Sequence, residues 1–166
     1  MANPIGRSPV LLGVRSPVVD SVVRVAAGFA RQLDAPLLCV IVDPSRFAAG
    51  RRSDGSIVVE SIDPDDDDAD QQMRASDLEA RLRSIVSPTG VEVAVRAEMG
   101  DPVRELSRVA DAEQALMIVV GTHRGRGRAS EFFSGSIAAQ LAHRQHRPVL
   151  VVPTDPVGSD EPLPWS

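Results

Sequence analysis

Residues 115–140 read ALMIVVGTHRGRGRASEFFSGSIAAQ, and this stretch decides the fold class. It starts with branched apolar side chains, continues through a glycine-rich segment and ends in a helix-forming sequence. A buried strand, a glycine-rich turn and a helix in this order are typical of sheets that carry helices on both faces. Such a turn holds a phosphate in some proteins and only redirects the chain in others.

The alternation of strand and helix extends in both directions from this stretch. Strand-like apolar runs lie at residues 9–14, 36–42 and 91–97 before it, and another lies at residues 148–153 after it. The segment after the first run has apolar residues at helical spacing. These are Val18, Val22, Val25, Phe29 and Leu33.

Two further helices are predicted from their apolar faces and end signals. One ends near Val86 and places Leu78, Leu82 and Ile85 on one face. The next starts with Asp101 as its cap and Pro102 at its first position. Its inward face consists of Val103, Leu106 and Ala110.

The pattern predicts an α/β fold, a three-layer sandwich whose five-stranded parallel sheet has the order 3-2-1-4-5 with helices on both faces. Ligands of such sheets bind beyond the carboxyl ends of the strands, where the strand order reverses. The glycine-rich segment at residues 121–136 follows the fourth strand. It is therefore expected beside that crevice.

The domain is expected to span residues 1–153. Within it, residues 43–66 are expected to form a long polar loop, in which SIVVES (56–61) is a candidate for a brief strand. The acidic run DPDDDDAD (63–70) lacks the alternating acids and the glycine of a calcium loop, so a solvated loop or helix start is expected there. The proline-rich tail at residues 154–166 is expected to be disordered.

Composition excludes several functions. The net charge is -5 with a pI near 5.2, which argues against nucleic-acid binding. All 18 basic residues are arginine, so lysine-dependent phosphate loops and Schiff bases are impossible within this chain. No apolar run is long enough to span a membrane and no signal peptide is recognised, so a cytoplasmic protein without a membrane partner is expected. Cys39 lies in the apolar run LLCVIV and is expected to be a buried small hydrophobe.

Related architectures lack their motifs here. The dinucleotide-binding glycine fingerprint is missing after the first strand, where the chain reads RSPVVDS (15–21). The G-x-S-x-G nucleophile turn is also missing.

Residues 8–153 instead resemble the universal stress protein family. Nucleotide-binding members carry G-x2-G-x9-G-(S/T) after the fourth strand, and Gly125, nine residues and then Gly135 with Ser136 match its second half. Gly121 stands one residue further from Gly125 than in that pattern. The stretch FFSGSIAAQLAHRQHRPVLVVP (132–153) is similar to the closing helix and strand of the family.

The resemblance implies a cleft for ATP or another adenine nucleotide, with Mg. It assigns the triphosphate to the glycine-rich loop, and backbone contacts with the adenine to Gly13 and Ile41. The loop residues concerned are Gly121, Thr122, His123, Gly125, Gly135 and Ser136. ATP-binding members place an aspartate after the first strand where this chain has Arg15, which can instead pair with a phosphate.

Three functions remain open at this point. The first is a regulator or sensor that binds ATP or AMP and forms a homodimer through the fifth strand, as the resemblance implies. The second is a dimeric interaction module of the same fold without a nucleotide. The third is a weak ATP hydrolase, for which the glycine-rich loop supplies no clear base. No catalytic residue and no protein metal site are predicted.

Overall fold

The computed structural model describes residues 6–44, 46–51, 57–61, 68–122 and 137–154. Five parallel strands form its central sheet, in the order β5-β2-β1-β6-β7. They are β1 (Val10–Val14), β2 (Leu37–Asp43), β5 (Val93–Met99), β6 (Met117–Gly121) and β7 (Val149–Val152). Numbered along the chain, the five strands have the predicted order 3-2-1-4-5, so the fold prediction is confirmed.

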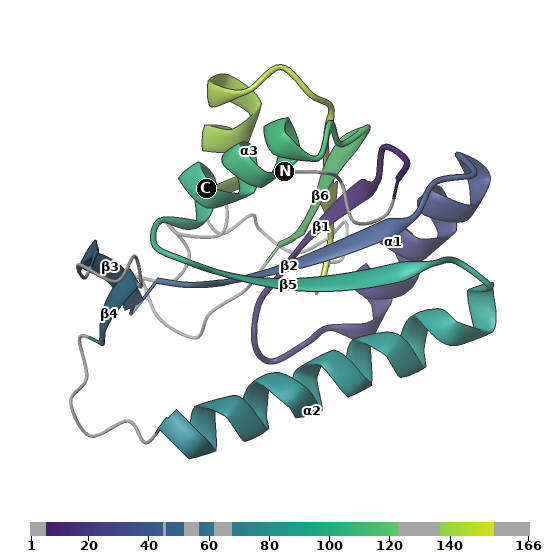
Figure 1. Ribbon diagram of the computed structural model, residues 1–166. Helices are drawn as coiled ribbons and strands as arrows, with labels where there is room; N and C mark the ends of the chain where they lie inside the picture. Colours follow the sequence, from purple (N-terminus) through teal and green to yellow (C-terminus); the bar gives the residue numbers. More distant parts are fainter. Residues whose placement is uncertain (1–5, 45, 52–56, 62–67, 123–136, 155–166) are drawn as a thin grey trace, which may run out of the picture.

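Helices cover both faces of this sheet (Figure 1). On one face lie α1 (Asp20–Gln32) and α2 (Asp68–Val86), and a short 3-10 helix, η1 (Ser87–Thr89), follows α2. On the other face lie α3 (Pro102–Ala112) and the helical residues 137–144. None of the helices in the described residues is both long and apolar enough to cross a membrane.

The sheet separates two layers of core because successive strand residues point to opposite faces. In β1, Val10 and Leu12 pack with α1 and α2, whereas Leu11 packs with α3. Cys39 and Val40 divide in the same way in β2. All five side chains are buried, so the central strands are apolar on both faces as their sequences predict.

The helix predicted from apolar spacing is α1, but these apolar residues make up only part of its buried face. Val25 is 37% exposed and Leu33, just after the helix, is 48% exposed. The buried residues of the helix are Val22, Val23, Ala26, Ala27 and Ala30. The prediction counted only large apolar side chains, while α1 packs on the sheet largely through alanines.

The predicted faces of the other two helices agree with the structure. Leu82 of α2 is fully buried, and Leu78 and Ile85 pack against the same core cluster. Asp101 caps α3, where its side chain accepts a hydrogen bond from the backbone N–H of Arg104 at 2.8 Å. Pro102 occupies the first turn.

A two-stranded antiparallel ribbon follows β2. It consists of β3 (Arg46–Arg51) and β4 (Ile57–Ser61). β4 falls on the stretch named as a brief strand, whereas β3 was expected to be loop. Its sequence RFAAGR lacks the apolar alternation of a strand, and its pairing has an irregularity between Ala48 and Gly50.

Candidate functional site

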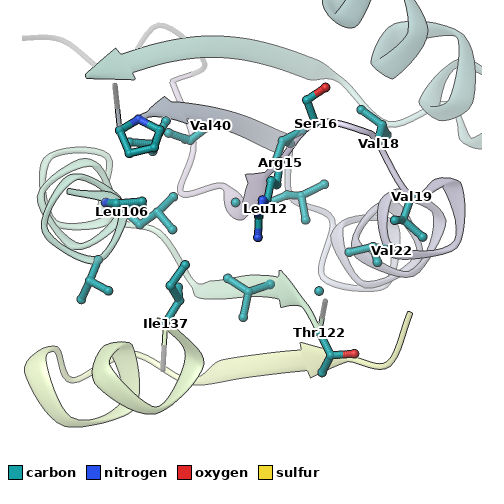
Figure 2. Close-up of a pocket in the computed structure, with 18 of the residues that line it drawn as sticks. Leu12, Arg15, Ser16, Val18, Val19, Val22, Val40, Leu106, Thr122 and Ile137 are labelled. Carbon is teal, nitrogen blue, oxygen red and sulfur yellow. The ribbon is translucent and has the colours of Figure 1, made fainter. Parts of the chain in front are cut away.

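A cavity of about 730 Å³ opens where the central strands end. The segments after β1 and β6 border it, together with the start of α1 and the start of α3 (Figure 2). The strand order reverses between β1 and β6, because the helices that follow these two strands lie on opposite faces. The cavity therefore lies at the crevice where ligands of parallel sheets bind.

The walls of the cavity are aliphatic and come from both core layers. Its floor consists of the last buried side chains of three strands, Leu12 of β1, Val40 of β2 and Val120 of β6. The α1 side contributes Val18, Val22 and Val23, and the α3 side contributes Val103 and Leu106. A volume of this size lies within the range of about 300–1,000 Å³ that small-molecule sites occupy.

Close packing at Gly13 shapes one wall. A Cβ atom on Gly13 would stand 3.0 Å from Cδ1 of Leu106 and 3.4 Å from Cγ1 of Val120. Glycine at this position therefore lets β1 and α3 approach each other below the cavity. Gly121 has a similar role on β6, since its Cβ would lie 3.0 Å from Val22 and 3.1 Å from Thr154.

Two charged residues belong to the described lining, Arg15 and Asp101. Arg15 is exposed, and Figure 2 shows its side chain between those of α1 and that of Leu106. The Asp101 carboxylate caps α3 through Arg104 N–H. Arg15 is thus the basic group that the described lining offers to an anion.

Two helix N-termini also border the cavity. Val19, the N-cap of α1, lines it, and no side chain caps that helix. Pro102 and Val103, in the first turn of α3, line it as well. Helix N-termini carry a partial positive charge and present backbone N–H groups. The Asp101 carboxylate already accepts from Arg104 N–H at the start of α3, so it is the start of α1 that favours an anionic ligand. Asp20, in the first turn of α1, pairs with Arg81 at 2.9 Å.

Thr122 and Thr154 join the two chain segments at the rim. The backbone N–H of Thr154 donates to the hydroxyl of Thr122 at 3.0 Å, and the hydroxyl of Thr154 donates to the carbonyl of Thr122. The backbone N–H of Thr122 donates to the carbonyl of Val152 at 2.8 Å, which continues the pairing of β6 with β7. We call this pair of threonines the threonine clasp.

The sequence profile described as "Universal stress protein family" matches residues 6–153. The chain belongs to this family. Comparison with curated proteins gives no match.

Solved universal stress proteins share the fold at low sequence identity. One from Archaeoglobus fulgidus, in complex with dAMP, is 20% identical, with a TM-score of 0.60 over 88% of this chain and 98% of its own. One in complex with cAMP is 19% identical, with a TM-score of 0.61 over 90% of this chain and 100% of its own. A family member from Burkholderia pseudomallei is 21% identical, with a TM-score of 0.61 over 88% of this chain and 96% of its own.

Four of the site residues predicted from the sequence lie at the same cavity in this universal stress protein. Gly13, Arg15, Gly121 and Thr122 all line the cavity. Ile41 does not belong to the described lining, because its side chain packs with the α1 core cluster while its neighbours in β2 reach the cavity. The remaining four residues lie outside the described residues. They are His123, Gly125, Gly135 and Ser136.

Sequence reasoning missed the part of the site that α3 and the chain after β7 supply. Asp101 was assigned only as a helix cap, and Thr154 only to the proline-rich segment at residues 154–166. The connection from β5 to β6 must pass over β2 and β1, and this brings the start of α3 to the crevice. The strand order was therefore the signal that could have found Asp101.

Other chemistry is limited in the part of the chain that the structure describes. Its His, Cys, Asp and Glu side chains form no cluster of three that could hold a metal ion. Burial raises the pKa of the Cys39 thiol to about 12, so the thiol is protonated at neutral pH and is not a nucleophile.

Proposed function

We propose that this universal stress protein binds an adenine nucleotide in the cavity and works as a homodimeric regulator or sensor. The observation that carries the proposal is the cavity itself, which combines aliphatic walls, the start of α1 and the Arg15 guanidinium at the end of the sheet. Aliphatic walls suit the faces of a base, and the positive groups suit a phosphate.

Two considerations support the choice of ligand. Related structures carry dAMP and cAMP, both adenine nucleotides with phosphate groups. The sequence after Thr122 adds Arg124, Arg126 and Arg128, together with the glycines of the family pattern. In our proposal this loop and Arg15 hold the phosphates, while the backbone at Gly13 contacts the base.

The first test is direct. The protein is purified, heated to release any bound small molecule, and the supernatant is examined by mass spectrometry. An adenine nucleotide in the supernatant supports the proposal and identifies the ligand as ATP, AMP or a cyclic form.

The second test is calorimetric titration with ATP, with and without Mg²⁺, of the wild type and the Gly135→Val variant. If Gly135 lies at the phosphate site, the added side chain blocks the approach of the oxyanion and ATP binding is lost. Gly28→Val is the matched control, because a Cβ at Gly28 meets nothing within 4 Å. Equal affinity in all three proteins would mean that the loop is not the site.

The second candidate is a dimeric interaction module that binds no nucleotide. Arg15 favours it, because nucleotide-binding members place a carboxylate there and a guanidinium cannot accept hydrogen bonds from ribose hydroxyls. A protein that releases no nucleotide and binds neither ATP nor AMP, yet remains dimeric, would support this candidate.

A further inference from the structure

The chain leaves the described fold at the rim of the cavity. Thr154 lines the cavity and is the last described residue before residues 155–166, which we call the tail. The threonine clasp fixes Thr154 to Thr122 through the hydrogen bond of 3.0 Å. The tail therefore starts next to the opening, whatever path it takes afterwards.

The tail is chemically complementary to the cavity. It reads DPVGSDEPLPWS and contains Asp155, Asp160 and Glu161 but no basic residue. It also contains Leu163 and the only tryptophan of the chain, Trp165. Apolar side chains of this size gain about 1.5–3 kcal/mol each when fully buried, and the walls of the cavity are aliphatic.

Charge favours the same pairing. Arg15 is the basic residue in the described lining. A carboxylate pairs well with a guanidinium, so an acidic tail offers Arg15 the type of group that a phosphate offers.

Reach does not limit this arrangement. The tail has twelve residues. Extended, such a segment spans about 40 Å. That length exceeds the diameter of a small domain, about 30 Å.

We propose that the tail docks in the cavity and competes with its ligand, so that the protein inhibits its own binding site. The competition rests on the proposed function, whereas the docking does not. In this proposal Trp165 or Leu163 lies against the aliphatic walls, and the acidic side chains of Asp160 and Glu161 pair with Arg15.

The fluorescence of Trp165 tests the docking without any nucleotide. The chain has one tryptophan and no tyrosine, so its emission reports on the tail alone. We expect emission at shorter wavelength and weaker quenching by acrylamide than in a synthetic peptide of residues 155–166. Arg15→Glu reverses the charge at the cavity and should raise the quenching toward that of the peptide. Arg31→Glu, in the last turn of α1 and away from the cavity lining, is the control and should not.

The competition is tested by titrating ATP into the full-length chain and into the full-length double variant Asp160→Asn with Glu161→Gln. A tail that occupies the cavity about nine-tenths of the time lowers the apparent affinity about tenfold. The double variant should therefore bind ATP more tightly by up to that factor. In the wild type, ATP should also raise the quenching of Trp165 as it displaces the tail.

The outcomes separate the two proposals. If neither protein binds ATP but Trp165 is protected in the wild type and released by Arg15→Glu, the nucleotide proposal fails and the docking stands. If Trp165 is quenched as strongly as the peptide, the docking is overturned. The docking is also overturned if Trp165 stays protected from acrylamide in Arg15→Glu but loses this protection when a dimer dissociates on dilution. That result would place the tail on the partner subunit or on the β7 edge.

Discussion

Gly13 lies so close to Leu106 that a Cβ atom on the glycine would stand 3.0 Å from Cδ1 of the leucine. Leu106 is almost fully buried and lines the cavity, so it can yield mainly toward the cavity space. The contact therefore links the packing of β1 against α3 to the room available for a ligand.

Gly13→Ala should destabilise the protein and weaken its ligand binding. Overpacking costs about 1–3 kcal/mol. Replacing glycine stabilises a protein by about 0.4–1 kcal/mol because it reduces the entropy of the unfolded chain, so the steric cost should exceed this gain. Urea unfolding and ATP titration measure the two effects. Gly28→Ala is the control and should stabilise the protein, because Gly28 lies within α1 with open space around its Cβ. Unchanged stability in Gly13→Ala would show that Leu106 moves without cost.

Arg15→Asp should weaken ATP binding about tenfold and change adenosine binding much less, because the guanidinium is expected to pair with phosphate. Calorimetry with both ligands measures the difference. Arg31→Asp alters the net charge equally at the far end of α1 and should leave both affinities unchanged. Tighter ATP binding by Arg15→Asp would show that the arginine obstructs the site, which would favour the interaction module.

Asp101 caps α3 and also places a negative charge at the cavity, and two substitutions of this residue separate the two effects. Asp101→Ala removes the cap of α3 and should cost about 1 kcal/mol of stability. Asp101→Asn keeps a side-chain oxygen for Arg104 N–H, so stability should change little. It also removes the acidic group of the described lining, and ATP binding should become tighter. Thermal unfolding and titration of both variants check this, and a loss of affinity in Asp101→Asn would contradict it.

The Cys39 thiol should make the protein less stable above pH 9. Burial raises its pKa in the folded protein to about 12, from the ordinary value of 9.0. Below pH 9 the thiol is protonated in both states, and between pH 9 and 12 only the unfolded state loses the proton. The free energy of unfolding should therefore fall in that window, by at most about 1.4 kcal/mol per pH unit.

The decline can be assigned to Cys39 because the chain contains no lysine and no tyrosine that would titrate in the same pH window. Urea unfolding at several pH values should show the decline in the wild type and a nearly flat profile in Cys39→Ala. Parallel profiles in the two proteins would refute the assignment to Cys39.

The dimer interface is predicted at the β7 edge. Val151 is 41% exposed on a strand that pairs only with β6 among the described strands. Exposed apolar edges tend to be covered, here by the same strand of a second copy about a two-fold axis. Val151→Arg should halve the mass measured by light scattering. Leu116→Arg is the control, because Leu116 is 42% exposed but lies before β6.

A truncation after Thr154 separates this interface from the tail. A dimer in both the intact and the truncated chain supports pairing through β7. A chain that is monomeric when intact and dimeric only when truncated would show that the tail covers the edge within one subunit.

The sheet could be predicted from the sequence because strands that are buried on both faces have continuous apolar sequences, such as LLCVIV in β2. The full buried face of α1 could not, because Ala26, Ala27 and Ala30 are completely buried but carry a weak hydrophobic signal. β3 was missed for a related reason. Its RFAAGR sequence has no alternation, and its pairing with β4 forms a ribbon apart from the main sheet.

The site was predicted only where its residues follow β1 and β6. Gly13, Arg15, Gly121 and Thr122 stand at these strand ends, which the expected topology brings together. Asp101 and Thr154 come from segments that reach the cavity through the path of α3 and the threonine clasp. Such contacts between distant segments leave no local pattern in the sequence. For Asp101 the strand order was the available signal.

The cavity floor has a consequence for the fate of the protein in a cell. Leu12 and Val40 belong to the two core layers and also line the cavity, so a ligand bound there would contact both layers of the core. A ligand that fills the cavity stabilises the folded state by about 2.7 kcal/mol at a hundred times its dissociation constant. A gain of that size lowers the unfolded fraction that proteases can attack, so the amount of this protein should follow the concentration of its ligand.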